Sequence, residues 1–149
     1  MKLSTRPRYA IRLMLDISRY SIHGEPVHLR EIATRNNLSK GYLEQLVVSL
    51  KNAQLIRSFS GRGGGYLLVR PADQISILEI IEATIGPINI VDCVGHPEEC
   101  INADYCECRT LWESLNHNIT GILDMYSLMD LSERGGVNKL KASLSESEV

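Results

Sequence analysis

Residues 29–53 read LREIATRNNLSKGYLEQLVVSLKNA, two segments of helical periodicity separated by a short polar turn. In the first segment, apolar residues recur three and four positions apart, from Leu29 to Ile32 and Ala33. Ser39 stands where the N-cap of a second helix is expected, and the buried stripe of that helix is predicted to comprise Leu43, Leu46, Val47 and Leu50. Two short helices joined by a tight turn predict a helix-turn-helix, a plan also found in proteins that never contact DNA.

The segment after the second helix makes this prediction more specific. Residues 55–60 and 66–69 have the composition of strands, and they flank the glycine-rich run 61–65, which indicates a β-hairpin wing. Arg57, Arg62 and Arg70 are expected to line the wing, where an arginine can enter a groove or follow the sugar-phosphate backbone. A nucleotide-phosphate loop is the alternative, but the run lacks the Gly-Lys-Ser/Thr ending of a P-loop and no helix follows it.

Helices are predicted on both sides of this unit. One covers residues 7–21, and another begins at the capping box Ser76-Ile77-Leu78-Glu79 and ends at Gly86-Pro87. From about Thr110 a longer helix carries an apolar stripe, predicted to comprise Leu111, Leu115, Ile119, Ile122 and Tyr126. We expect the same helix of a second subunit to cover this stripe, because two-fold homodimers are the commonest oligomers. The alternative is that the stripe packs on the first helix of its own chain, and both can be partly true.

The charge of the chain divides into two halves of opposite sign. Residues 1–70 hold twelve Lys and Arg against four Asp and Glu, whereas residues 71–149 hold four against fourteen. A basic half of this size is typical of a phosphate-binding surface, although a solvated basic face without a partner has the same composition. The sequence contains neither an apolar run long enough to cross a membrane nor a signal peptide at its start, so a cytoplasmic protein without a membrane partner is predicted.

All four cysteines lie between positions 93 and 108 of the 149-residue chain, at spacing C-x6-C-x5-C-x-C. Thiolates that converge on one metal ion or cluster can come from a single loop, whereas a disulfide framework spreads its cysteines along a chain. The spacing lacks the paired C-x2-C knuckles of structural zinc sites and the two ferredoxin patterns, so zinc is permitted but not preferred. The pattern therefore predicts thiolate ligands and leaves the metal open.

Four motifs in order resemble one family of bacterial regulators. They are Met1-Lys2-Leu3-Ser4-Thr5 with Arg8-Tyr9-Ala10, the turn and helix Leu38-Ser39-Lys40-Gly41-Tyr42-Leu43-Glu44-Gln45-Leu46, the wing Gly63-Gly64-Gly65-Tyr66-Leu67, and three spaced cysteines before Leu111-Trp112. Over about residues 1–131 the chain resembles the IscR/NsrR/CymR family of winged-helix transcription regulators, many of which sense through an Fe–S cluster. It is most similar to the IscR-like branch, chiefly through Tyr42-Leu43-Glu44-Gln45. The resemblance implies a 2Fe–2S cluster in preference to 4Fe–4S.

The resemblance also implies the cluster ligands. The three ligand cysteines of the family correspond to Cys93, Cys100 and Cys106. The histidine that IscR-like proteins place three residues after the third cysteine is replaced by Arg109, and the N-terminal aspartate of NsrR-like proteins by Arg8. The fourth ligand is therefore open, with Cys108 or Glu44 as the first candidates, Glu44 from the same chain or from a partner subunit. The other candidates are His96, Asp92 and Asp104.

The predicted fold is mainly α with a small β-hairpin wing. Residues 1–86 form a winged helix-turn-helix DNA-binding domain, 87–109 a cluster-binding loop, 110–131 a dimerisation helix with a short following helix, and 132–149 a disordered tail. The residues predicted to contact double-stranded DNA are Ser39, Lys40, Tyr42, Glu44, Gln45, Arg57, Arg62, Gly63 and Gly64.

The predicted function is a homodimeric regulator that reads a palindromic operator and senses through an Fe–S cluster whose state alters operator binding. No nucleophile, base and orienting group occur together in a pattern typical of an enzyme. Two alternatives remain: a zinc- or thiol-redox-controlled regulator of the same fold, and an Fe–S redox or electron-transfer protein.

Overall fold

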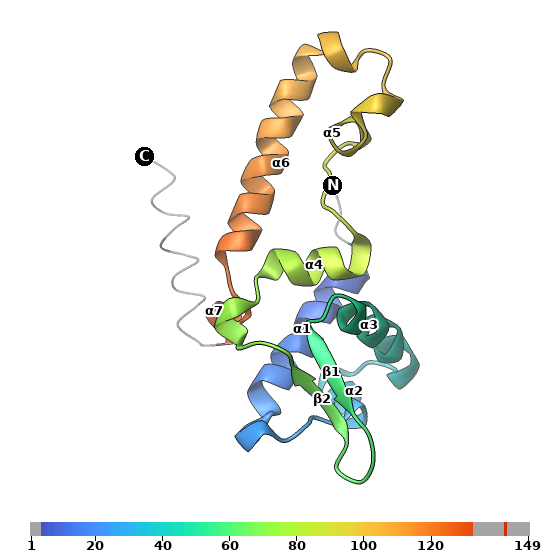
Figure 1. Cartoon of the computed structure of the whole chain (residues 1–149), viewed down its shortest axis with the longest axis vertical. Helices are drawn as coiled ribbons and strands as arrows, with labels where there is room; N and C mark the ends of the chain where they lie inside the picture. The colour runs from blue at the N-terminus through green and yellow to red at the C-terminus, as the bar shows by residue number, and fades with distance from the viewer. Residues whose placement is uncertain (1–3, 133–141, 143–149) are drawn as a thin grey trace.

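The computed structural model describes residues 4–132 and residue 142. A helical body carries a two-stranded hairpin, and a long helical projection extends from the body (Figure 1). The helices are α1 (Thr5–Tyr20), α2 (Leu29–Asn36), α3 (Lys40–Asn52), α4 (Ile77–Ile85), α5 (Asp92–Gly95), α6 (Glu107–Met125) and α7 (Leu128–Ser132), and the strands are β1 (Ile56–Phe59) and β2 (Gly65–Leu68). The mainly α fold with a hairpin wing is confirmed. The predicted tail starts at Ser132, here the last residue of α7, and apart from Ala142 its remainder lies outside the described residues.

The helix-turn-helix consists of α2 and α3. Asn37 ends α2 in the left-handed conformation (φ 52°), which Asn tolerates better than most residues. Ser39 caps α3 as predicted, because its side chain accepts a hydrogen bond from the backbone N–H of Tyr42 at 3.2 Å. The predicted stripe of α3 is buried throughout, from Leu43 to Leu50. Local capping chemistry and apolar periodicity therefore account for where α3 begins and which of its faces is buried.

The wing is an antiparallel pair in which Ile56 lies opposite Leu68 and Phe59 opposite Gly65. Val27 adds a short bridge on the outer edge of β2, exchanging backbone hydrogen bonds of 3.0 and 2.9 Å with Tyr66. Gly65 is required at this bridge because a Cβ there would overlap the carbonyl oxygen of Val27. The bridge thus ties the wing to the segment that precedes α2.

The hydrophobic core lies around α1, which packs on α2, α3, α4, α7 and β2. Its predicted inner face, Ala10, Leu13, Met14 and Ile17, is fully buried. From α4 the core receives Ile77, Ile80 and Ile81, and the predicted capping box at Ser76 and Glu79 is present with both of its hydrogen bonds. The start of α4 therefore lies in the core beneath the helix-turn-helix.

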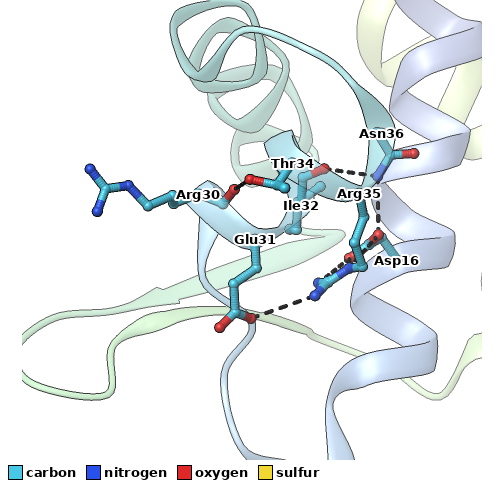
Figure 2. A network of polar contacts seen from close by, with 7 residues as sticks. All are labelled: Asp16, Arg30, Glu31, Ile32, Thr34, Arg35 and Asn36. Carbon is cyan, nitrogen blue, oxygen red and sulfur yellow. Dashed lines mark hydrogen bonds and ion pairs between the residues drawn. The ribbon is translucent and has the colours of Figure 1, made fainter.

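One buried carboxylate joins α1 to α2. Asp16, only 7% exposed, accepts hydrogen bonds from Arg35 Nη2 at 2.6 Å, from Arg35 Nε at 3.1 Å and from Asn36 Nδ2 at 3.0 Å (Figure 2). The hydrogen bond to Asp16 raises the pKa of Arg35 above its ordinary value. The guanidinium also lies 3.9 Å from the centre of the Tyr20 ring. This network sets the position of α2, and therefore of the turn that leads into α3.

Residues 87–125, called the arm below, leave the body after α4 and return to it at the end of α6 (Figure 1). Within the arm α5 packs against α6, and the backbone N–H of Ile90 donates to Asn116 Oδ1 at 3.0 Å. The end of α6 meets the start of α4, because Ser76 bridges Ser127 and the N–H of Ile77 donates to the carbonyl of Tyr126 at 2.8 Å.

The apolar residues of α6 lie on two faces instead of one. Ile119 and Leu123 are half-buried on the side that packs mainly on α4 and α5, rather than on the first helix, and Tyr126 packs against the core. Leu111, Leu115 and Ile122 are 55%, 40% and 51% exposed, and Met125, which the predicted stripe omitted, is 77% exposed. The exposed face is thus narrower than predicted and extends to Met125.

Candidate nucleic-acid interface and cysteine arm

The N-terminal half of α3 presents a polar surface to solvent. Ser39, Lys40, Glu44 and Gln45 are exposed there, and the Lys40 ammonium lies 3.4 Å from the Glu44 carboxylate. Gln offers a donor and an acceptor that match an adenine edge, and Glu can accept from cytosine. The Lys40–Glu44 pair must open or shift before either side chain can contact DNA alone.

Tyr42 differs from its neighbours because it also packs against α1. Its ring meets that of Tyr9 edge to face, with centroids 5.9 Å apart and planes at 89°, and its hydroxyl lies 3.5 Å from Thr5 Oγ1. The ring is half-buried, so the predicted base contact can involve only its outer part.

The predicted wing residues occupy different environments. Arg62 and Gly63 are exposed at the tip, whereas Gly64 is buried and donates its N–H to the carbonyl of Gly61 at 3.0 Å. A Cβ on Gly64 would overlap the carbonyl oxygen of Phe59, so close packing within the turn accounts for this glycine. The Arg57 guanidinium lies 5.3 Å from the centre of the Phe59 ring.

Arg70 lies at the base of the wing, where it lines a surface pocket with Arg57 and Leu67, but its guanidinium is held by α4. Its guanidinium forms an ion pair of 2.7 Å with Glu79, the glutamate of the α4 capping box. Partial burial raises the pKa of Glu79, but the hydrogen bonds from Arg70 and from the backbone N–H of Ser76 outweigh it and hold this pKa below its ordinary value. The pair links the end of the hairpin to α4, and no local sequence pattern predicts this contact.

Sequence reasoning also missed Arg30. Arg30 and Lys40 line two shallow surface pockets. One pocket lies between α2 and the wing, and the other lies beside the turn that joins α2 to α3. Arg30 points away from the Asp16 network into solvent (Figure 2). A basic residue in the first turn of the first helix of a helix-turn-helix was the available signal, since that helix crosses the DNA backbone.

The arm holds all the cysteines, and the structure brings part of the set together. Cys93 and Cys100 are half-buried and line one pocket, together with Asp92, His96, Glu99, Ile101 and Asn102. Cys106 is the half-buried N-cap of α6, and Cys108, the second residue of that helix, is exposed. Among the described residues, no three Cys, His, Asp or Glu side chains converge closely enough to hold a metal ion.

The donor types in the arm nevertheless suit an Fe–S cluster, which takes thiolates and, in some sites, imidazole. Glu44 belongs to α3 on the body, far from the tip of the arm (Figure 1), so its own chain does not bring it to the cysteines. Arg109 pairs with Glu113 at 2.8 Å and provides no lone pair for a metal.

No helix among the described residues is both long and apolar enough to traverse a lipid bilayer. Taken together, two helices joined by a tight turn, a solvent-facing polar second helix and a glycine-tipped hairpin define a winged helix-turn-helix transcription regulator. The model of the Rrf2 family, described as an iron-dependent transcriptional regulator, matches residues 3–134, and the chain belongs to this family.

Individual relatives agree with this assignment. The chain is 40% identical over 131 residues to the HTH-type transcriptional regulator IscR of Photorhabdus laumondii, covering 88% of this chain and 79% of that protein. It is 38% identical over 139 residues to a putative HTH-type transcriptional regulator of Haemophilus influenzae, covering 93% and 91%.

Solved structures show the same fold. CymR, the global cysteine regulator of B. subtilis, is similar with a TM-score of 0.72 and 36% identity, over 89% of this chain and 96% of that one. T. potens IscR gives a TM-score of 0.70 and 30% identity, over 88% and 85%. The predicted resemblance is confirmed, as is the prediction of a regulator rather than an enzyme, which leaves the electron-transfer alternative without support.

Proposed function

We propose that this transcription regulator senses through an Fe–S cluster held by Cys93, Cys100 and Cys106, with 2Fe–2S favoured over 4Fe–4S. The observation that supports the proposal is the placement of every cysteine on the arm, between the end of α4 and the first turn of α6. The description of the family as iron-dependent and the IscR names of the relatives support it. When bound, the cluster would supply an iron centre that can be oxidised or lost. Either change would give a protein chemically different from the one with an intact cluster.

The chain's own residues would connect this centre to DNA. Gln45 and Glu44 would read base edges, Lys40, Ser39 and Arg62 would hold phosphates or enter the minor groove, and Arg57 and Gly63 would support the wing contact. The charges of the basic half favour this use, since each phosphate contact releases condensed counterions.

The arm supports a two-fold dimer. Leu111, Leu115, Ile122 and Met125 form an apolar face that the described residues leave exposed. Joining two copies there would pair two helix-turn-helix units and suit a palindromic operator. The cluster could alter DNA binding only if the dimer has two arrangements that differ in their affinity for DNA, and if the cluster favours one of them.

The test compares holo and apo protein from one anaerobic preparation. We expect a red-brown protein that contains iron and sulfide, and gel shifts in which cluster removal changes affinity for at least one operator. Cys100→Ser should abolish the colour, whereas Ser114→Cys on α6 serves as the matched thiol control. A protein without iron and sulfide, or equal operator affinity with and without the cluster, would overturn the sensing proposal.

Control by thiol oxidation or zinc is the second candidate. The exposed thiol of Cys108 and the pocket shared by Cys93 and Cys100 favour it, and a relative, Staphylococcus aureus CymR, has been solved in an oxidized form. This candidate predicts a colourless protein whose DNA affinity changes with zinc content or with the number of free thiols.

A further inference from the structure

One histidine lies in the same pocket as two of the proposed cluster cysteines. His96 lines the same pocket as Cys93 and Cys100, whereas Cys106 and Cys108 do not. Cys93 lies on α5, and His96 is the residue that ends this helix three positions later. The turn is closed by the backbone N–H of His96, which donates to the carbonyl of Asp92 at 2.8 Å.

The imidazole already has a partner on one side. Its Nδ1 lies 3.3 Å from the Glu98 carboxylate, and both side chains are largely exposed. With the proton on Nδ1 donated to Glu98, the lone pair of Nε2 is available to a metal. A carboxylate that holds the second nitrogen of a ligating histidine is a recurrent arrangement, because it selects the tautomer and increases the basicity of the ligand.

The competing candidates fit less well. Cys108 lies two positions beyond Cys106 at the start of α6, and side chains at that spacing do not face each other on a helix. Glu44 is paired with Lys40 on the body. A carboxylate such as Asp92 is a harder ligand than imidazole, and imidazole suits iron beside thiolates.

We infer that His96 is the fourth ligand of the cluster, binding through Nε2 while Glu98 positions the ring. This inference rests on the proposed function, and it adds to the three thiolates a ligand that is neither Cys108 nor Glu44.

The test uses the full chain, prepared without oxygen with 15N-labelled histidine and reduced with dithionite. Iron and sulfide are assayed, and 15N coupling to the cluster is measured by electron–nuclear double resonance. We expect strong coupling in the wild type and in His117→Ala, an exposed histidine on α6. His96→Cys should keep iron and sulfide but lose the coupling, and His96→Ala should lose the coupling or the cluster.

Glu98→Gln should keep the coupling and weaken iron binding by about 10–100-fold, whereas Glu25→Gln, at an exposed position on the body, should leave both unchanged. Iron and sulfide without histidine coupling in the wild type, or coupling that persists in His96→Cys, would overturn this inference and leave the sensing proposal intact. A wild-type protein without iron and sulfide would overturn both.

Discussion

Asp16 is the charged side chain that is buried in the core of the described residues. Its partner Arg35 is more exposed to solvent. Arg35 retains 28% exposure of its side chain, so it could turn toward water if Asp16 were removed. Asp16 cannot turn toward water in this way. If Arg35 were removed, its carboxylate would remain buried with only Asn36 as a hydrogen-bond donor. The two halves of one ion pair therefore differ in what their loss would cost.

Arg35→Met should destabilise the protein by about 3 kcal/mol, because it leaves a buried carboxylate without its counter-charge. Arg30→Met is the matched control on the same helix, and it should change stability by no more than about 0.5 kcal/mol while weakening binding to all DNA sequences. Urea unfolding measures the first effect and gel shifts the second. Equal stability of the two variants would contradict the role given to the Asp16 network.

Glu79 should make stability sensitive to acid. Its pKa in the folded protein is lowered, so its contribution is present above its ordinary pKa of 4.5 and is lost as the pH falls through the lowered value. Glu79→Gln should therefore reduce stability at neutral pH and flatten the decline below about pH 5. Thermal unfolding from pH 7 to pH 3 measures this dependence, with exposed Glu25→Gln as the control. An unchanged decline in Glu79→Gln would refute the assignment.

At the scale of the elements, sequence reasoning succeeded where the physics is local. The caps at Ser39 and Ser76 and the inner faces of α1 and α3 follow from side chains within four residues of each other. It failed where an element meets a distant one. The pair between Arg70 and Glu79 depends on tertiary packing, and periodicity alone could not separate the inner face of α6 from its exposed face.

The sequence predicts some features of the candidate site and not others. The polar face of α3 and the thiols of the arm were evident from residue types and spacing. The half-burial of Tyr42 against Tyr9 was not, because it depends on how α1 crosses α3. Nor could the sequence show that His96 shares a pocket with both Cys93 and Cys100, since Cys100 follows a second turn, Pro97–Glu99, whose direction relative to α5 no local pattern predicts.

Gln45 and Arg62 should affect DNA binding in different ways. Gln45→Ala should relax preference at one base pair by about 1–3 kcal/mol, because a bidentate base contact is lost. Arg62→Ala should weaken binding to all sequences and reduce the slope of log affinity against log salt by about 1. Competition gel shifts over a salt series distinguish the two effects. Unchanged specificity and slope in both variants would rule out this interface.

Two glycines should respond oppositely to the addition of a methyl group. Gly65→Ala should cost about 1–3 kcal/mol, because the new Cβ would overlap the Val27 carbonyl and force the wing away from that segment. Gly41→Ala has open space and a helical backbone, so it should stabilise α3 by about 0.5–1 kcal/mol. Chemical denaturation measures both, and a neutral Gly65→Ala would show that the bridge contributes little.

For the whole molecule, the exposed face of α6 determines the expected assembly. Ile122→Glu should convert the proposed dimer to a monomer, because it would bury an unpaired charge at the proposed two-fold interface. His117→Glu, on a different face of the same helix, should leave the dimer intact. Light scattering at several concentrations gives the mass of each variant. A wild type that is monomeric at every concentration would remove the basis for reading paired half-sites.

The meeting of Ser76 with Ser127 has a consequence for how such proteins can diverge. This bridge and the packing of α4 on α6 hold the end of α6 at the body, so the segment between these two helices can change length without rethreading the core, because loop-closure entropy grows only slowly with length. Insertions or deletions in the cysteine segment should therefore leave the winged body folded. Related chains could then replace the cysteine segment by one that binds a different ligand, while the winged helix-turn-helix that contacts DNA stays the same.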